Sequence, residues 1–230
     1  MFKLDILIQD FFGILTVVPH TLLLALVILG LSTLLGGVIA MIQQSKIPIL
    51  SQLIIVFKSF FRGTPAVVLL LLMYFALPEI SSSVLGLVGI DFNPNDLSPY
   101  ITVIVTFSVT MSAFQSEIIR GSFLSVDYGQ IESANSLGYN YFQTLRKVIV
   151  PQALAEAIPD LLNSYMVIIK MLSLAFLVTV VDIFAEAKIA GAMTFRYLEA
   201  FVAAALVYWL LSTILTFITN KYELRLRKGH

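Results

Sequence analysis

The sequence predicts an all-α integral membrane protein with five transmembrane helices in a single domain, residues 1–230. Hydrophobic residues make up 59% of the 230 residues, charged residues only 12%, and the mean hydropathy is +0.95. A soluble globule of this composition would have nowhere to place its apolar surface. Residues 11–44 contain no Asp, Glu, Lys or Arg, so we expect a retained transmembrane helix there and not a cleaved signal peptide.

The five expected spans follow from segment length, because a helix needs about 20 apolar residues to cross about 30 Å of hydrocarbon. Four segments meet this requirement or nearly do, at about 14–42, 99–116, 161–181 and 200–219. A fifth, at about 63–78, is shorter. The apolar stretch 47–57 is flanked by charge, so we expect it to lie along the membrane interface before the chain turns inward.

Lysine and arginine are divided unevenly between alternate loops, and the richer set is expected in the cytoplasm. The richer set has ten members: Lys46, Lys58, Arg62, Arg120, Arg146, Lys147, Lys221, Arg225, Arg227 and Lys228. The poorer set has three, Lys3, Lys188 and Arg196. This places the N-terminus outside, the C-terminus in the cytoplasm, and residues of about 120–151 in a cytoplasmic segment.

Within that segment, local signals predict two short helices joined by a glycine. Asp127 precedes Gln130 by three residues, and Gly138 follows where a left-handed residue would end a helix over about 128–137. Asn140 and Gln143 repeat the capping pattern, and Pro151 is expected to end the second helix by removing a backbone donor. An amphipathic connection lying on the membrane surface is the alternative interpretation.

The spacing of this segment resembles a known motif. Glu132-Ser133-Ala134 is followed after three residues by Gly138, and after nine more by Val148-x-Val150-Pro151. This resembles the EAA loop of prokaryotic ABC import permeases, in which EAA, three residues, Gly, nine residues and Ile-x-Leu-Pro follow one another. Ser133, Val148 and Val150 replace Ala, Ile and Leu by residues of similar volume.

The resemblance continues along nearly the whole chain and is to the polar amino acid branch, the histidine, glutamine, arginine and cystine permeases. Between Lys170 and Ser173 that branch usually has a polar pair, where this sequence has Met171-Leu172. The segments that carry the resemblance are Arg62-Gly63-Thr64-Pro65, Glu117-Ile-Ile-Arg120-Gly121, Gly129-Gln130-Ile131-Glu132, Pro151-Gln152-Ala153 and Lys170-x-x-Ser173-Leu174-Ala175.

The resemblance implies a type I ABC importer permease fold in a bacterial cytoplasmic (inner) membrane. The first short helix would be a coupling helix that docks in a groove of an ATP-binding subunit. Any side chain at Gly138 is predicted to uncouple transport from hydrolysis. The implied coupling residues are Gln130, Glu132, Ser133, Ala134, Ser136, Leu137 and Gly138.

The same resemblance implies the partners: a dimer of ATP-binding subunits, a second identical or homologous permease subunit, an extracytoplasmic solute-binding protein, membrane lipid and an amino acid, with cystine first. The sequence contains no Walker-type phosphate loop, so we expect no cofactor or catalytic residue in this chain, and ATP and Mg bound by the partner ATPase. With no cysteine and two histidines, no metal site is expected. No nucleic-acid partner is expected either.

Polar residues of the fourth predicted span form a stripe. Glu156, Asp160, Asn163 and Lys170 are separated by four, three and seven residues, so they share one helix face. An unpaired lysine inside a span costs about 2.5 to 3.5 kcal/mol. In one interpretation these residues and Ser173 line a substrate path and offer both charges to a zwitterion. In the other interpretation, Glu156 and Asp160 are hydrated at the cytoplasmic surface and Lys170 pairs with a residue of another helix.

Three further features concern helix breaks and packing. The run Arg62, Gly63, Thr64 and Pro65 is consistent with a gate or hinge, or with an ordinary helix start. Pro159 could open the fourth span by removing one backbone bond. Small residues recur every four positions in the first span, which predicts close helix packing. They are Ser32, Gly36 and Ala40.

The alternative function is an ion-coupled secondary carrier or a channel that works without an ATPase. Such a protein needs no cytoplasmic helix-glycine-helix segment, and a proton relay needs more intramembrane acids than this sequence offers.

Overall fold

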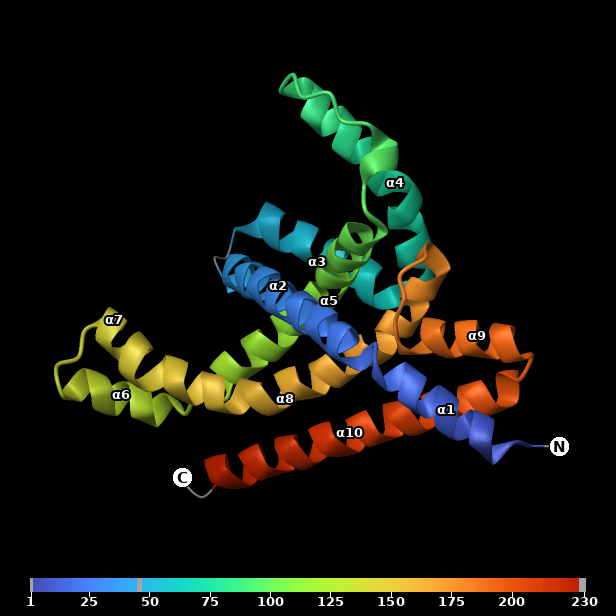
Figure 1. The fold of residues 1–230 in the computed structure, drawn as a ribbon. Coiled ribbons are helices and arrows are strands. Elements are labelled where there is room, and N and C mark those ends of the chain that lie inside the picture. The colour runs from blue at the N-terminus through green and yellow to red at the C-terminus, as the bar shows by residue number, and fades with distance from the viewer. Residues whose placement is uncertain (1, 45–46, 228–230) are drawn as a thin grey trace.

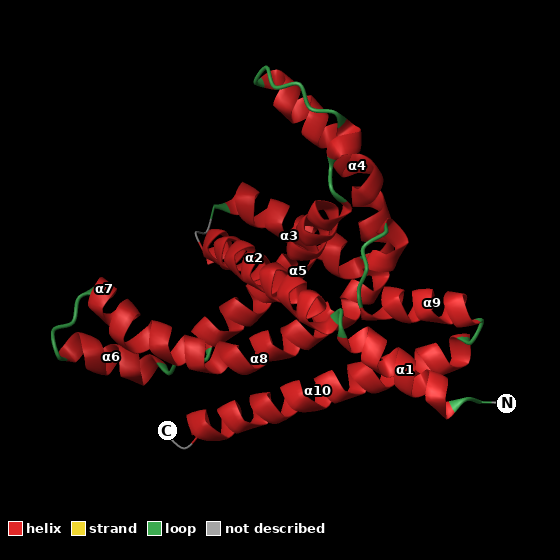
Figure 2. Cartoon of the chain, viewed as in Figure 1, coloured by secondary structure: helices red, strands yellow, loops and turns green. Residues whose placement is uncertain are grey.

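The computed structural model describes residues 2–44 and 47–227, and helices account for nearly all of these ranges (Figure 2). Five helical runs are long and apolar enough to cross a membrane, as predicted. They are Val18–Gln44 (α2), Ala66–Leu87 (α4), Pro99–Leu124 (α5), the composite run Tyr141–Val178, and Tyr197–Lys221 within α10 (Tyr197–Arg227). The predicted fold class is therefore confirmed.

The composite run joins four helical pieces without a break. These are α7 (Tyr141–Thr144), a π-helical turn (Leu145–Ile149), α8 (Val150–Met171) and a 3-10 helix (Leu172–Val178). The remaining elements are α1 (Leu4–Leu15), α3 (Pro48–Gly63), a 3-10 turn (Pro94–Asp96), α6 (Tyr128–Ser136) and α9 (Ile183–Thr194).

The spans differ from their predicted limits. The third runs to Leu124 and not to about 116, and the fourth run begins at Tyr141 and not near 161. The first begins at Val18 and not near residue 14, because a turn at Thr16, whose N–H donates to the Gly13 carbonyl at 3.1 Å, separates α1 from α2. The second continues past Pro78 to Leu87. A proline removes one backbone donor, and in a membrane helix neighbouring groups re-satisfy the freed carbonyl, so Pro78 does not end α4.

The arrangement places the two termini at opposite ends of the molecule (Figure 1). The C-terminus lies at the same end as α6 and α7, and the N-terminus lies at the other end beside α9 and the start of α10. The predicted topology requires this separation, while the side of the membrane that each end faces stays a prediction. Lys46 and Lys228, two of the residues counted for orientation, lie outside the described residues.

The core sits where α2, α5 and α8 pack together. Ile28, Phe107, Ile168 and Leu172 are all fully buried there. A second cluster, around Ile14, Ile183 and Val207, attaches α1 and α9 to α10. Close packing of this kind associates helices in a membrane, where lipid is as apolar as the side chains.

The small-residue face of α2 packs against α5, as the sequence predicts. Ser32, Gly36 and Ala40 are all buried. A Cβ atom at Gly36 would lie 2.7 Å from the Gln115 Cβ and 2.9 Å from the Ser116 backbone N. The two backbones are therefore so close that only glycine fits at this position.

Candidate functional site

The segment formed by α6, Gly138 and α7 has the local structure that the sequence predicts. The Asp127 carboxylate caps α6 by accepting a 3.0 Å hydrogen bond from the Gly129 N–H. Gly138 is left-handed, with φ of +82°, a conformation that glycine adopts without strain. Asn140 and Gln143 form a reciprocal capping box through two 2.9 Å bonds. We call α6, Gly138 and α7 the coupling segment.

The predicted coupling residues divide into exposed and internal positions. Glu132, Ser133, Ser136, Leu137 and Gly138 are exposed. Gln130 is also exposed, and its side-chain oxygen accepts a 2.8 Å bond from the Gln152 amide, which ties α6 to α8. Ala134 is only 4% exposed. Its expected contact with a partner stays a prediction.

The coupling segment also exposes large aromatic side chains that the motif alone did not supply. Phe142 is 77% exposed, and Tyr128 and Tyr141 are similarly open. They join Leu137, a predicted coupling residue that is 78% exposed. Aromatic and apolar anchors of this kind dominate the energetics of protein interfaces. Their sequence signal was the presence of bulky apolar residues in a segment assigned to the cytoplasm.

The prediction that Pro151 ends the second short helix is wrong. α7 continues through the π-helical turn into α8, and Pro151 lies in the first turn of α8. Proline is tolerated in a first turn, and a π-helical turn shifts the hydrogen-bond register just before it. The coupling segment is therefore joined by continuous helix to the fourth span.

The polar stripe of α8 is an exposed face of the chain. Glu156, Asp160, Asn163 and Lys170 are all exposed, which confirms that they share one side of the helix. The Lys170 side chain makes no ion pair with any described residue. Ser173 departs from this set: its hydroxyl donates to the Lys170 carbonyl at 2.7 Å, and it lines a separate groove beside Lys188 and Phe201.

Two grooves run beside the stripe and meet at α5. The first, of about 350 Å³, includes Glu156 and Asp160 together with Ser122 and Ser125. The second, of about 490 Å³, lies farther along α8 and is lined by residues of α3, α4, α5 and α8. Glu117 and Ile118 line both grooves. Residues of the second groove include Arg62, Thr64, Thr110, Phe114, Ser164, Val167 and Met171.

Sequence reasoning missed the polar groups that α5 and α8 contribute to the second groove. Ser164 is 7% exposed and lies between the stripe and the core. The Thr110 hydroxyl is buried with no hydrogen-bond partner among the described residues. Thr102, Thr106 and Thr110 recur every four residues, so they place hydroxyl groups along one face of α5. This spacing is the sequence signal that could have indicated the polar groups of α5.

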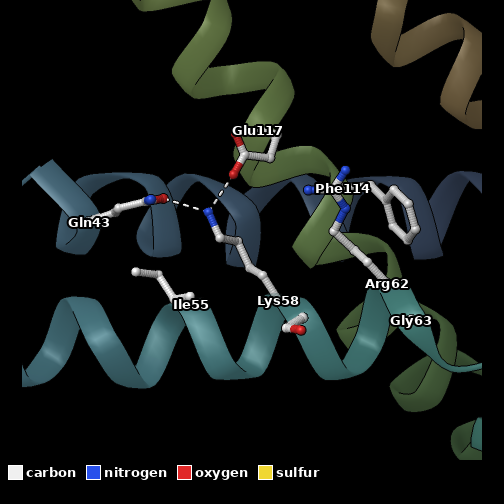
Figure 3. A pocket seen from close by; sticks show the side chains of 8 residues that line it. Gln43, Ile55, Lys58, Arg62, Gly63, Phe114 and Glu117 are labelled. Carbon is white, nitrogen blue, oxygen red and sulfur yellow. Dashed lines mark hydrogen bonds and ion pairs between the residues drawn. The ribbon is translucent and has the colours of Figure 1, made fainter.

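An ion-pair network lies where α2, α3 and α5 meet (Figure 3). Lys58, only 6% exposed, donates to the Gln43 side-chain oxygen at 2.7 Å and pairs with Glu117. Arg120 donates to the other Glu117 oxygen through two bonds of 3.0 and 2.8 Å. From the sequence alone Lys58 is visible only as a charge that indicates topology, because its partners are distant in sequence.

The predicted hinge residues have different outcomes. α3 ends at Gly63, and Thr64 and Pro65 are extended, so the helix is broken at the predicted place. The Arg62 guanidinium lies 5.5 Å from the centre of the Phe114 ring. Pro159, in contrast, does not open α8, which runs unbroken through it. Movement at the break stays a prediction.

A buried acid beyond the fourth span anchors α9. One Asp182 carboxylate oxygen accepts from the Ala185 N–H and the other from the Tyr208 hydroxyl, each at 3.0 Å. Burial raises the pKa of Asp182, and these hydrogen bonds oppose that rise. This geometry suits a structural cap.

Within residues 2–44 and 47–227, no group of three or more His, Cys, Asp or Glu side chains could hold a metal ion.

Comparison with known proteins gives relatives along almost the entire chain. The probable amino-acid permease protein YxeN of Bacillus subtilis (strain 168) is 32% identical over 226 residues, covering 98% of this chain and 96% of the relative. The L-cystine transport system permease protein TcyL of the same organism is 33% identical over 224 residues, covering 97% and 91%.

Solved structures agree with the fold. A crystal structure of an amino acid ABC transporter with histidines matches with a TM-score of 0.81 at 25% identity, covering 98% of this chain and 99% of that one. The MetNI methionine ABC transporter matches with a TM-score of 0.63 at 16% identity. The model of the family described as "Binding-protein-dependent transport system inner membrane component" matches residues 32–228. The chain therefore belongs to this family, the membrane permease subunits of ABC importers.

Proposed function

We propose that the chain is the transmembrane subunit of an ATP-driven importer that moves a polar amino acid by alternating access. The observation that carries this proposal is the continuous helix from the coupling segment to the polar face of α8. Closure of an ATPase against α6 would move this helix as one piece and, with it, Glu156, Asp160, Asn163 and Lys170. Amino-acid permeases and an amino acid ABC transporter among the similar proteins support the substrate class.

The exposure of the polar face supports assembly with a second permease subunit. Polar and charged side chains on a span are costly when they face lipid, yet Asn163 and Lys170 are exposed in the single chain. A second copy, related by a twofold axis, would enclose them in a path between subunits. Two ATP-binding subunits, which bind ATP and Mg, would dock on the coupling segments, and a solute-binding protein would deliver substrate from outside.

A zwitterion is the ligand chemistry that the α8 face suits best, because it has two carboxylates toward one end and an ammonium toward the other. Cystine is the first substrate to test. Two relatives, TcyL and TcyB, are named L-cystine transport system permease proteins and are 33% and 31% identical to this chain.

The test is reconstitution of the complex with its ATPase and binding protein in proteoliposomes, with each amino acid scanned for stimulated ATP hydrolysis and uptake. We expect stimulation by cystine or another polar amino acid and no uptake without ATP. Uptake driven by a proton or sodium gradient alone would favour the ion-coupled carrier instead. No stimulation by any amino acid would overturn the proposal.

Lys170→Met tests the proposed path directly. Loss of a charge-assisted hydrogen bond of about 1.5 to 3 kcal/mol should weaken half-maximal stimulation of ATP hydrolysis by about 10- to 100-fold in substrate concentration. Lys221→Met is the matched control, because Lys221 is an exposed lysine at the far end of α10. Unchanged stimulation and uptake in Lys170→Met would remove Lys170 from the path.

A further inference from the structure

A third groove, of about 640 Å³, lies between α2, α3 and α5 (Figure 3). Its described lining comes from these three helices, and the α8 stripe does not contribute to it. The polar groups that face it are the Gln43 amide, the Ser59 hydroxyl, the Lys58 ammonium, the Arg62 guanidinium and the Glu117 carboxylate. We call it the α3 groove.

The α3 groove has an excess of positive charge. Glu117 is its one acidic lining residue, and Lys58 and Arg120 already occupy both carboxylate oxygens. Arg62 has no acidic partner among the described residues and rests against the Phe114 ring instead. Because the guanidinium is always charged and its donors remain available, the groove is suited to an anion with several acceptor oxygens.

The surroundings of the α3 groove indicate which anion. α3 also has an exposed apolar face, with Ile49 73% exposed, and Ile55 itself lies in the groove lining. Leu53, Val56 and Phe60 are exposed on the same helix. An interfacial helix of this kind places its apolar side chains at the boundary between headgroups and acyl chains.

We propose that the α3 groove binds the headgroup of an anionic phospholipid, with phosphatidylglycerol as the test case. Phosphate oxygens would accept hydrogen bonds from Arg62, Ser59 and the Gln43 amide, and the acyl chains would lie along Ile55 and Val56. Basic pockets between membrane helices on the cytoplasmic side select such headgroups, and the Lys and Arg distribution assigns this end to the cytoplasm. The lipid would hold α3 against α2 beside the break at Gly63.

The test is native mass spectrometry of the full-length chain in its complex, titrated in mixed micelles with phosphatidylglycerol or phosphatidylcholine. One basic residue near an anionic surface contributes about 1 kcal/mol, which is about a fivefold change in Kd. We therefore expect phosphatidylglycerol to bind at least about fivefold more tightly than phosphatidylcholine, and Arg62→Gln to lose about fivefold of that affinity.

Two further variants and one competitor complete the test. Ser59→Glu adds a negative charge to the α3 groove without changing Arg62 and should cost a similar factor. Lys221→Gln removes a basic residue outside the groove and should leave binding unchanged. Three results would each overturn the proposal. They are equal binding of the two lipids, unchanged binding in both groove variants, and displacement of phosphatidylglycerol by millimolar inorganic phosphate. This readout is independent of transport, so its failure and that of the proposed function are distinguishable.

Discussion

Gly138→Leu should uncouple ATP hydrolysis from transport while the chain still inserts and assembles. Gly138 has φ of +82°, and no atom lies within 4 Å of the Cβ that it would gain. The cost is therefore backbone strain of about 1–2 kcal/mol together with any collision with a docked ATPase. We expect basal hydrolysis to persist and uptake per ATP in proteoliposomes to fall by about tenfold or more.

Gly138→Asn separates the two causes of that loss. Asparagine tolerates the left-handed conformation better than other side chains, so it removes most of the strain and keeps the bulk. If strain dominates, Gly138→Asn should retain most of the coupling. If close approach of the ATPase dominates, both variants should lose it. Normal coupling in Gly138→Leu would contradict a tight corner between α6 and α7.

Gly36→Leu should prevent stable packing of α2 against α5. A bare Cβ would already lie 2.7 Å from the Gln115 Cβ, so the larger side chain must push the two backbones apart. Overpacking typically costs about 1–3 kcal/mol, which we expect for Gly36→Ala, and Gly36→Leu should exceed it. The measurement is the yield and Tm of the purified complex.

Gly30→Leu is the matched control for that experiment. Gly30 lies on the same helix, is exposed, and has no atom within 4 Å of its would-be Cβ. Its substitution should leave the Tm nearly unchanged and can raise helix propensity. Equal losses in Gly30→Leu and Gly36→Leu would show that α2 resists any larger residue and would contradict a specific close approach.

The features that the sequence predicts well are those encoded within one segment. Uninterrupted apolar length identifies the spans, and the coupling segment is specified by neighbours such as Asp127 with Gly129 and Asn140 with Gln143. Small residues at four-residue spacing likewise predict the packing face of α2. Each of these signals lies within one continuous segment of the chain.

The features that it does not predict depend on residues brought together by folding. Lys58 is 15 residues from Gln43 and 59 residues from Glu117 in sequence, so neither partner is visible in a local pattern. Pro151 illustrates a different limit. The same proline can end one helix or begin the next, and the π-helical turn before it decides which.

The run Tyr141–Val178 has 38 residues, a length of about 57 Å at about 1.5 Å per residue, or nearly twice the hydrocarbon thickness. Pro159 stands at its midpoint, and the helix runs unbroken through it, so the two halves of the run can move as one piece. In the proposed mechanism this run rotates as a rigid body about its midpoint. A displacement of α7 at one end then moves the opposite end, near Thr179, in the opposite direction. Closing the substrate path at one side of the membrane and opening it at the other would therefore be a single movement.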